Sequence, residues 1–274
     1  MKNSEKTAHA PLKCEKNGVC AEKNAPVAVF DSGAGGISVL RAIHTRLPHE
    51  ALLYFGDSIN APYGTRPAAE VKALTLSHAA RLLTRAKALV VACNTATALS
   101  VTALRRRYPA VPIVGIEPAL KPAVALAPGG RILVLATETT LREEKFRALC
   151  EKHARGATVL PLPAPRIVEF VERGEVDGEG LRAYLATLLA PFTRQPPDAI
   201  VLGCTHFPFA KAAIARVLPD VPMLDGAEGT AKELQRRLAA RGLLNPSPER
   251  GTVTLTTSAP GALSLYLRLF AGGS

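Results

Sequence analysis

The sequence predicts an α/β protein of two units, each a mostly parallel sheet flanked by helices. Short apolar, β-branched runs alternate with helical patterns, and this alternation occurs twice along the chain. Each set contains a run that ends in a cysteine, in KALVVACNTATALS at 87–100 and in DAIVLGCTHFPFA at 198–210. With 274 residues, of which 47% are hydrophobic, the chain can bury a substantial core.

The first set of elements begins at residue 26. Residues 1–25 are polar and lack periodicity, so we expect them to form a mobile N-terminal extension. The sequence then predicts strands at 26–30, 51–56, 88–92 and 111–116, and helices at 36–47, 68–86 and 97–108.

The second set repeats this order. Strands are predicted at 131–136, 157–162, 199–203 and 221–226, and helices at 140–154, 180–192 and 208–218. The segment 117–130 carries three prolines and two glycines, which indicates a crossing between the two units. A helix at 227–242, a strand at 252–258 and a closing helix are expected to return to the first unit. We therefore predict a first domain of 26–118 plus 228–274 and a second domain of 119–227.

Composition limits the classes of function. The net charge is +11, and its densest run is formed by Arg105, Arg106 and Arg107. No recognisable nucleic-acid-binding motif accompanies this charge, so we favour a solvated basic surface over nucleic-acid binding. No run reaches the roughly 18 apolar residues of a membrane span, and we place the protein in the cytoplasm. Five cysteines without an export signal predict reduced thiols, and no spacing among them predicts a metal site.

The two strand-end cysteines point to acid/base chemistry. Ligands of parallel α/β sheets bind outside the carboxyl ends of the strands, where Cys93 and Cys204 are expected. If the two units face each other, one thiolate could remove a proton from a carbon centre while the other thiol delivers a proton to the opposite face. This arrangement inverts configuration without a cofactor.

Alternatives remain open for each cysteine. Cys93 taken alone could be a small buried hydrophobic residue at a strand end. Cys204 and His206 could form a hydrolase-like nucleophile pair, although that interpretation leaves Cys93 unexplained.

A glycine-rich segment, VAVFDSGAGG, supplies Asp31 and Ser32 at the end of the first strand. Free N–H groups at the following helix N-terminus suit a carboxylate or a phosphate. The segment is not a GxGxxG motif and lacks a P-loop lysine, yet Asp57 after the second strand keeps a nucleotide-binding alternative open. The nearby Pro62, Tyr63 and Gly64 predict a turn that could present backbone amides and a phenol to a ligand.

Together these segments resemble the glutamate racemase family of the aspartate/glutamate racemase superfamily. The matching pieces occur in family order: FDSGAGGISVL, YFGDSINAPYG, VVACNTATA, VGIEPALKPA, VLGCTHFPF, LDGAEGTA and LTTSAPGALSLYLRLF. The resemblance implies an α/β fold of two pseudo-symmetric domains, each a mostly parallel sheet flanked by helices, with the active site in the cleft between them. It also implies cofactor-independent racemisation of L-glutamate and D-glutamate, with no metal, to supply D-glutamate for peptidoglycan. We expect glutamate as the ligand, no membrane or nucleic-acid partner, and a homodimer.

The resemblance also implies roles for individual residues. Cys93 would exchange the α-proton on the D-glutamate side and Cys204 on the L-glutamate side, with Asp31 and His206 assisting; which of them assists which thiol stays open. Glu169 would lie near the histidine, its alternative being a solvated helix carboxylate. The residues expected to hold the substrate are Asp31, Ser32, Pro62, Tyr63, Gly64, Asn94, Thr95 and Thr205.

The sequence departs from the family pattern at Glu143, Phe146, Ala164 and Phe207, none of which is a proposed catalytic thiol. Aspartate and hydantoin racemases and one-cysteine decarboxylases would share the fold, but the decarboxylases lose one cysteine. A catalytically idle binding or regulatory protein is the alternative from another class. Such a module has no need of two opposed acid/base groups.

Overall fold

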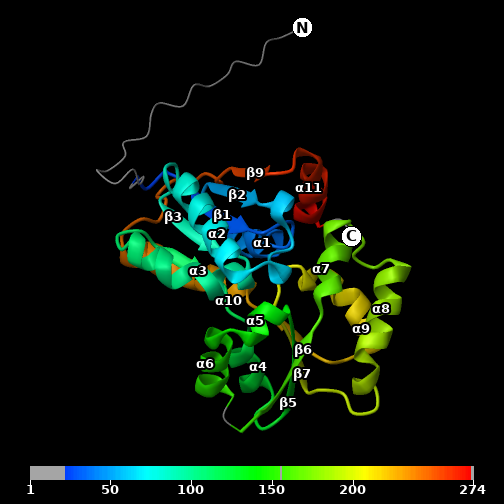
Figure 1. The fold of residues 1–274 in the computed structure, drawn as a ribbon. Coiled ribbons are helices and arrows are strands. Elements are labelled where there is room, and N and C mark those ends of the chain that lie inside the picture. The colour runs from blue at the N-terminus through cyan, green and yellow to red at the C-terminus, as the bar shows by residue number, and fades with distance from the viewer. Residues whose placement is uncertain (1–21, 155, 273–274) are drawn as a thin grey trace.

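Two parallel sheets form the framework of the protein (Figure 1). The computed structural model describes residues 22–154 and 156–272. The first sheet has the order β4-β3-β1-β2-β9, built from β1 (Val27–Asp31), β2 (Leu52–Gly56), β3 (Ala88–Val91), β4 (Ile113–Gly115) and β9 (Val253–Thr257). The second has the order β6-β5-β7-β8, built from β5 (Arg131–Ala136), β6 (Thr158–Pro163), β7 (Ala199–Leu202) and β8 (Met223–Asp225). The predicted fold class is confirmed.

Helices flank both sheets. They are α1 (Ile37–Arg46), α2 (Ala68–Leu83), α3 (Asn94–Arg107), α4 (Leu120–Leu126), α5 (Glu138–Arg142), α6 (Glu144–His153), α7 (Pro165–Glu172), α8 (Glu179–Leu189), α9 (Lys211–Val217), α10 (Ala227–Ala240) and α11 (Leu263–Ala271). Short 3-10 turns are η1 (Ser58–Asn60), η2 (Tyr63–Thr65), η3 (Ala190–Phe192), η4 (Phe207–Ala210) and η5 (Pro260–Ala262). Among the described helices, none is both long and apolar enough to span a bilayer.

The central strand β1 shows why the first sheet is covered on both faces. Successive side chains of a strand point to opposite faces. Val27 and Val29 accordingly join a core with residues of α1, α10 and α11, whereas Ala28 and Phe30 join a second core with residues of α2 and α3. Every residue of β1 is buried, and a fully buried valine contributes about 1.5–3 kcal/mol to folding.

The C-terminal segment completes the first sheet. Strand β9 pairs in parallel with β2, with Leu52 opposite Val253 and Gly56 opposite Thr257, and α10 packs against α1. This is the return to the first unit that the sequence predicted; the domain boundaries at 118/119 and 227/228 stay a prediction.

Three local expectations differ from the structure. The helix expected at 140–154 is divided at Glu143, whose extended backbone (ψ 142°) ends α5 and starts α6. The expected crossing segment 117–130 contains α4, in which Pro122 is tolerated because it lies in the first turn. Residues 1–21 of the predicted extension lie outside the described residues, and Ala25, which was included in it, is buried.

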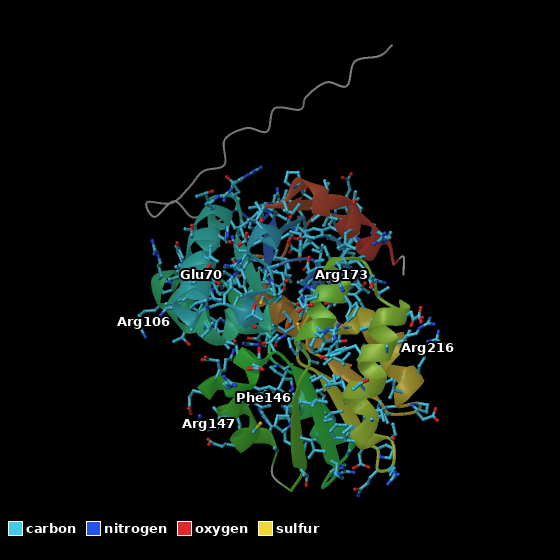
Figure 2. The ribbon with its side chains drawn as sticks, turned by 45° about the vertical axis from the view of Figure 1, so that its right-hand side comes forward. Glu70, Arg106, Phe146, Arg147, Arg173 and Arg216 are labelled. Carbon is cyan, nitrogen blue, oxygen red and sulfur yellow. The ribbon has the colours of Figure 1, made fainter. Side chains whose placement is uncertain are left out.

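Charged side chains lie mainly at the periphery. Figure 2 shows Arg106, Arg147 and Arg216 on the outside of the molecule, and each is exposed. Arg147 pairs with Glu144 and Arg216 with Asp177, so part of the basic charge is balanced locally.

The predicted catalytic residues Asp31, Cys93 and Cys204 lie at the carboxyl ends of strands. Asp31 ends β1, Cys93 lies two residues beyond β3, and Cys204 lies two residues beyond β7 in the second sheet. The same offset after an inner strand of each sheet brings the two thiols to one pocket.

Candidate active site

Cys93 is held at the start of α3. It is the N-cap residue of that helix, and its Sγ accepts a hydrogen bond from the Ala96 amide at 3.5 Å. Burial, together with the nearby charge of Asp31, raises the pKa of Cys93 to about 12, although Ala96 and the Ser32 hydroxyl act in the opposite direction. Cys93 is therefore a protonated thiol in the ligand-free site at neutral pH.

Cys204 belongs to a chain of polar contacts in the second half of the molecule, the unit that contains the second sheet. Its Sγ lies 3.6 Å from His206 Nδ1, and His206 Nε2 lies 2.6 Å from Glu172 Oε1 at the end of α7. Burial alone would lower the pKa of His206, but the hydrogen bonds with Cys204 and Glu172 outweigh it and raise the pKa well above its usual value. His206 thus lies as an imidazolium between the Cys204 sulfur and the Glu172 carboxylate.

Glu172, and not Glu169, is the glutamate beside His206. The prediction of Glu169 is wrong because Glu169 is exposed, whereas Glu172 is partly buried and contacts the imidazole. Helical phase explains the difference: Ile167, Val168, Phe170 and Val171 form the buried side of α7, and Glu172 lies one turn beyond the pocket-lining Val168. The spacing of four residues between Val168 and Glu172 was the feature of the sequence that could have identified Glu172.

The glycine-rich loop serves close packing between the two halves. Glu172 Oε1 also accepts the Ala34 amide at 2.7 Å, so this N–H is occupied rather than left for an anion. A Cβ added at Gly33 would lie 1.9 Å from Glu172 Oε1, and one added at Gly35 would lie 2.4 Å from His206 Nδ1. The glycines are needed because side chains of the second half occupy that space.

Asp31 joins the two units through a hydrogen bond with Thr205. It is fully buried and accepts hydrogen bonds from the Gly33 amide and the Thr205 hydroxyl, both at 3.0 Å; the Ser32 hydroxyl lies 3.5 Å away. Burial raises the pKa of Asp31 to about 6, against the lowering effect of the His206 charge. The carboxylate thus stays mostly ionised at neutral pH.

A small pocket with a cavity volume of about 20 Å³ has both thiols in its lining, whereas Asp31 is not among its lining residues. Ten of the predicted site residues line it: Ser32, Pro62, Tyr63, Gly64, Cys93, Asn94, Thr95, Cys204, Thr205 and His206. Four lining residues had not been predicted: Thr137, Thr140, Val168 and Gly203. Thr137 follows β5 directly, so the rule that strand ends face the ligand could have identified it.

The unpredicted threonines extend the polar wall. Thr95 Oγ1 lies 3.1 Å from Thr137 Oγ1 and 3.4 Å from Thr140 Oγ1. The hydroxyl of Thr139, next to them, donates to the Gly64 carbonyl at 2.8 Å. The second half thereby contacts the Pro62–Gly64 turn of the first.

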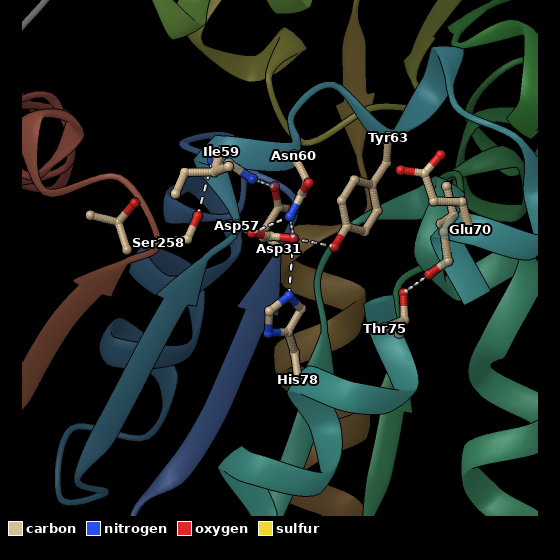
Figure 3. A network of polar contacts seen from close by, with 12 residues as sticks. Asp31, Asp57, Ile59, Asn60, Tyr63, Glu70, Thr75, His78 and Ser258 are labelled. Atoms are coloured by element: carbon tan, nitrogen blue, oxygen red, sulfur yellow. Dashed lines mark hydrogen bonds and ion pairs between the residues drawn. The ribbon is translucent and has the colours of Figure 1, made fainter. Parts of the chain in front are cut away.

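Asp57, considered as a ribose-binding acid, is not available for that role. It is fully buried, and its carboxylate accepts hydrogen bonds from Asn60, Tyr63 and His78 (Figure 3). The nucleotide-binding alternative therefore lacks the free carboxylate on which it depended.

Known proteins share this sequence and architecture. The Asp/Glu/Hydantoin racemase family model matches residues 35–234. The glutamate racemase of Clostridium acetobutylicum is 46% identical over 237 residues, 86% of this chain and 93% of that protein. Among solved structures, glutamate racemase from Thermus thermophilus in complex with β-chloro-D-alanine matches with a TM-score of 0.75, 38% identity and coverage of 90% of this chain and 94% of that one. Escherichia coli glutamate racemase, in complex with L-glutamate and the activator UDP-MurNAc-Ala, matches with a TM-score of 0.77, 31% identity and coverage of 91% and 96%.

Two parallel sheets that meet at a pocket, together with these matches, define the protein as an amino-acid racemase. The chain belongs to the Asp/Glu/Hydantoin racemase family and, within it, to the glutamate racemases. The resemblance drawn from the sequence motifs is confirmed.

Proposed function

We propose that this protein interconverts L-glutamate and D-glutamate by moving the α-proton between Cys93 and Cys204, and that its D-glutamate supplies peptidoglycan synthesis. The observation that carries the proposal is the pair of buried thiols, one from each sheet, lining a single pocket. The curated relatives support glutamate as the substrate.

In the L-to-D direction, Cys204 is the base. Its thiolate, paired with His206, removes the α-proton of L-glutamate, and the electron pair stays on the α-carbon. The protonated thiol of Cys93 then delivers its proton to the opposite face, which yields D-glutamate. This leaves Cys93 as thiolate and Cys204 as thiol, the form that accepts D-glutamate in the reverse reaction.

The assisting groups divide between the thiols by proximity. His206, oriented by Glu172, serves Cys204. Asp31, whose charge raises the pKa of Cys93, serves Cys93 and favours its protonated form. This assignment is our proposal for the question that the sequence left open.

The pocket wall offers groups that suit a dicarboxylic amino acid. The hydroxyls of Ser32 and Thr95 can donate to carboxylates, whereas the Thr205 hydroxyl already donates to Asp31. Asn94 Oδ1 is buried without a hydrogen-bond partner among the described residues, and we assign it to the α-ammonium group. Pro62, Tyr63 and Gly64 also line the pocket.

The proposal includes a cytoplasmic setting and a homodimer. Cys93, Cys150 and Cys204 are free thiols, as a reducing compartment keeps them. Light scattering of the purified protein tests the dimer.

Circular dichroism of L-glutamate and of D-glutamate, in H₂O and in D₂O and without added cofactor, tests the reaction. The wild type should racemise both enantiomers, and in D₂O deuterium should enter the α-position of the product because its proton comes from an exchanged thiol. Cys93→Ala and Cys204→Ala should each abolish turnover. Cys150→Ala is the matched control, because Cys150 is also a free thiol but lies on α6 outside the pocket.

The outcomes separate the parts of the proposal. If the wild type leaves both glutamate enantiomers unchanged and turns over aspartate instead, the substrate assignment fails. If either pocket variant keeps wild-type turnover, the two-thiol mechanism fails.

A further inference from the structure

The loop at 57–66, between β2 and α2, forms one wall of the pocket. It contributes Pro62, Tyr63 and Gly64 to the lining. The Tyr63 side chain is 1% exposed, and its hydroxyl donates to Asp57 Oδ2 at 2.8 Å. The position of the wall therefore depends on what holds Asp57.

Asp57 is the centre of a network that ties the loop to the sheet. Asn60 Nδ2 donates to both of its oxygens, at 3.1 and 2.9 Å, and His78 Nε2 lies 3.0 Å from Oδ2. Burial by itself would raise the pKa of Asp57, but the hydrogen bonds from His78, Tyr63 and Asn60 lower it well below the usual value. Asp57 is therefore anionic, so His78 Nε2 must carry the hydrogen that the two share.

Besides Ser258, which also interacts with Asp57 and accepts from the Ile59 amide, His78 is the partner that comes from outside the loop. It projects from α2, and its ring packs beside Phe30 of β1 and Phe55 of β2, with centroids 5.6 and 4.9 Å away. Its side chain is 12% exposed. The two aromatic rings fix its orientation, and Figure 3 shows His78 pointing from its helix toward Asp57.

The other ring nitrogen indicates that His78 is not placed for stability alone. His78 Nδ1 is buried and has no hydrogen-bond partner among the described residues. A buried polar atom without a partner costs folding free energy. An apolar side chain of similar size would fill the same space between the phenylalanines without that cost.

We propose that His78 is a positioning residue for the reaction. It holds Asp57, Asp57 holds Tyr63 and Asn60, and the loop is thereby fixed against the substrate. His78 does not touch the substrate and acts through Asp57. The inference rests on the proposed function for its kinetic consequence but not for its effect on the loop.

Two substitutions separate the donor from the ring. His78→Phe keeps an aromatic ring between Phe30 and Phe55 but removes the donor. His78→Gln places an amide N–H near the position of Nε2 but removes the ring. His44→Phe is the matched control, because His44 also lies on a helix, packs on a phenylalanine (Phe270) and has a buried Nδ1 without a partner, yet does not line the pocket.

Kinetics and hydrogen exchange of the full chain give two readouts. We expect His78→Phe to raise KM for L-glutamate about 5- to 10-fold with kcat within twofold, because the thiols are untouched while the wall loosens. Amide exchange in the peptide covering 57–66 should accelerate in the same variant. His78→Gln should restore both values toward wild type, even if its Tm falls, and His44→Phe should change neither.

The exchange measurement keeps this inference separate from the proposed function. If the wild type does not racemise glutamate but exchange at 57–66 follows the donor as described, the loop role stands and the substrate assignment fails. If His78→Phe leaves KM and exchange at wild-type values, or if both variants lose kcat in proportion to Tm, His78 is a packing residue and the proposal is wrong.

Discussion

Replacing Glu172 by glutamine tests the polar chain behind Cys204. The change removes a negative charge 2.6 Å from His206 Nε2 while keeping the size of the side chain, and the amide oxygen can still accept from Ala34. Without that charge, the pKa of His206 moves down toward its usual value. The imidazolium beside Cys204 therefore loses its proton at a lower pH than in the wild type.

The size of the effect follows from the charge that is lost, because the amide oxygen can still accept from His206. A hydrogen bond to a charged group contributes about 1–1.5 kcal/mol more than a neutral one, which corresponds to a fall of roughly 5- to 12-fold in kcat/KM. The fall must be equal for L-glutamate and D-glutamate, since the equilibrium constant between enantiomers is one. The alkaline limb of the pH profile of kcat/KM should also shift to lower pH, because that profile reports groups of the free enzyme.

Glu169→Gln is the control, since Glu169 lies on the same helix three residues earlier and is exposed. Initial rates from circular dichroism between pH 6 and 10 give the comparison. A Glu172→Gln enzyme with kcat/KM within threefold of wild type and an unmoved alkaline limb would refute the role assigned to Glu172.

Three further predictions concern buried groups. Burial raises the pKa of Asp31 from 3.8 to about 6, so the folded state holds that proton more tightly. The stability that this proton contributes is fully present below pH 3.8 and is lost as the pH rises through about 6. Asp31→Asn should therefore raise the free energy of urea unfolding by at most about 3 kcal/mol at pH 7.5, with little difference at pH 4, while racemisation is lost. Gly35→Ala would place a methyl group 2.4 Å from His206 Nδ1, and we expect kcat/KM to fall at least about 100-fold with an unchanged far-UV spectrum. Lys87→Met leaves Glu50 buried without the Nζ that now lies 2.6 Å away, which should lower the free energy of unfolding by about 3–5 kcal/mol; adding Glu50→Gln should recover part of it.

The strand-end rule accounts for what the sequence predicted best. Cys93 and Cys204 follow apolar runs that could only be buried strands, and the carboxyl ends of such strands face the ligand. Both thiols were therefore predicted together with the pocket that they line. Thr137 follows the same rule but was not named among the predicted site residues.

Residues whose role depends on helical phase or on the close approach of distant segments were harder to predict from the sequence. Glu169 and Glu172 are both plausible in RIVEFVERGE, and choosing between them requires the side of α7 that is buried. The glycine-rich loop looked like an anion cradle because a sequence does not reveal that Glu172 and His206, far along the chain, fill the space above Gly33 and Gly35. Long-range contacts of this kind have no local signature.

The pairing of β9 with β2 has a consequence for how the protein is made. The strands of the second sheet lie between residues 131 and 225, so they leave the ribosome before β9 at 253–257 does. During synthesis, the second unit can fold while the first sheet still presents the open edge of β2, and an unpaired strand edge is a template for wrong pairing. A segment synthesised after the whole second sheet thus protects the nascent first sheet from aggregation, and truncation within it should reduce soluble yield before it affects the chemistry of the thiols.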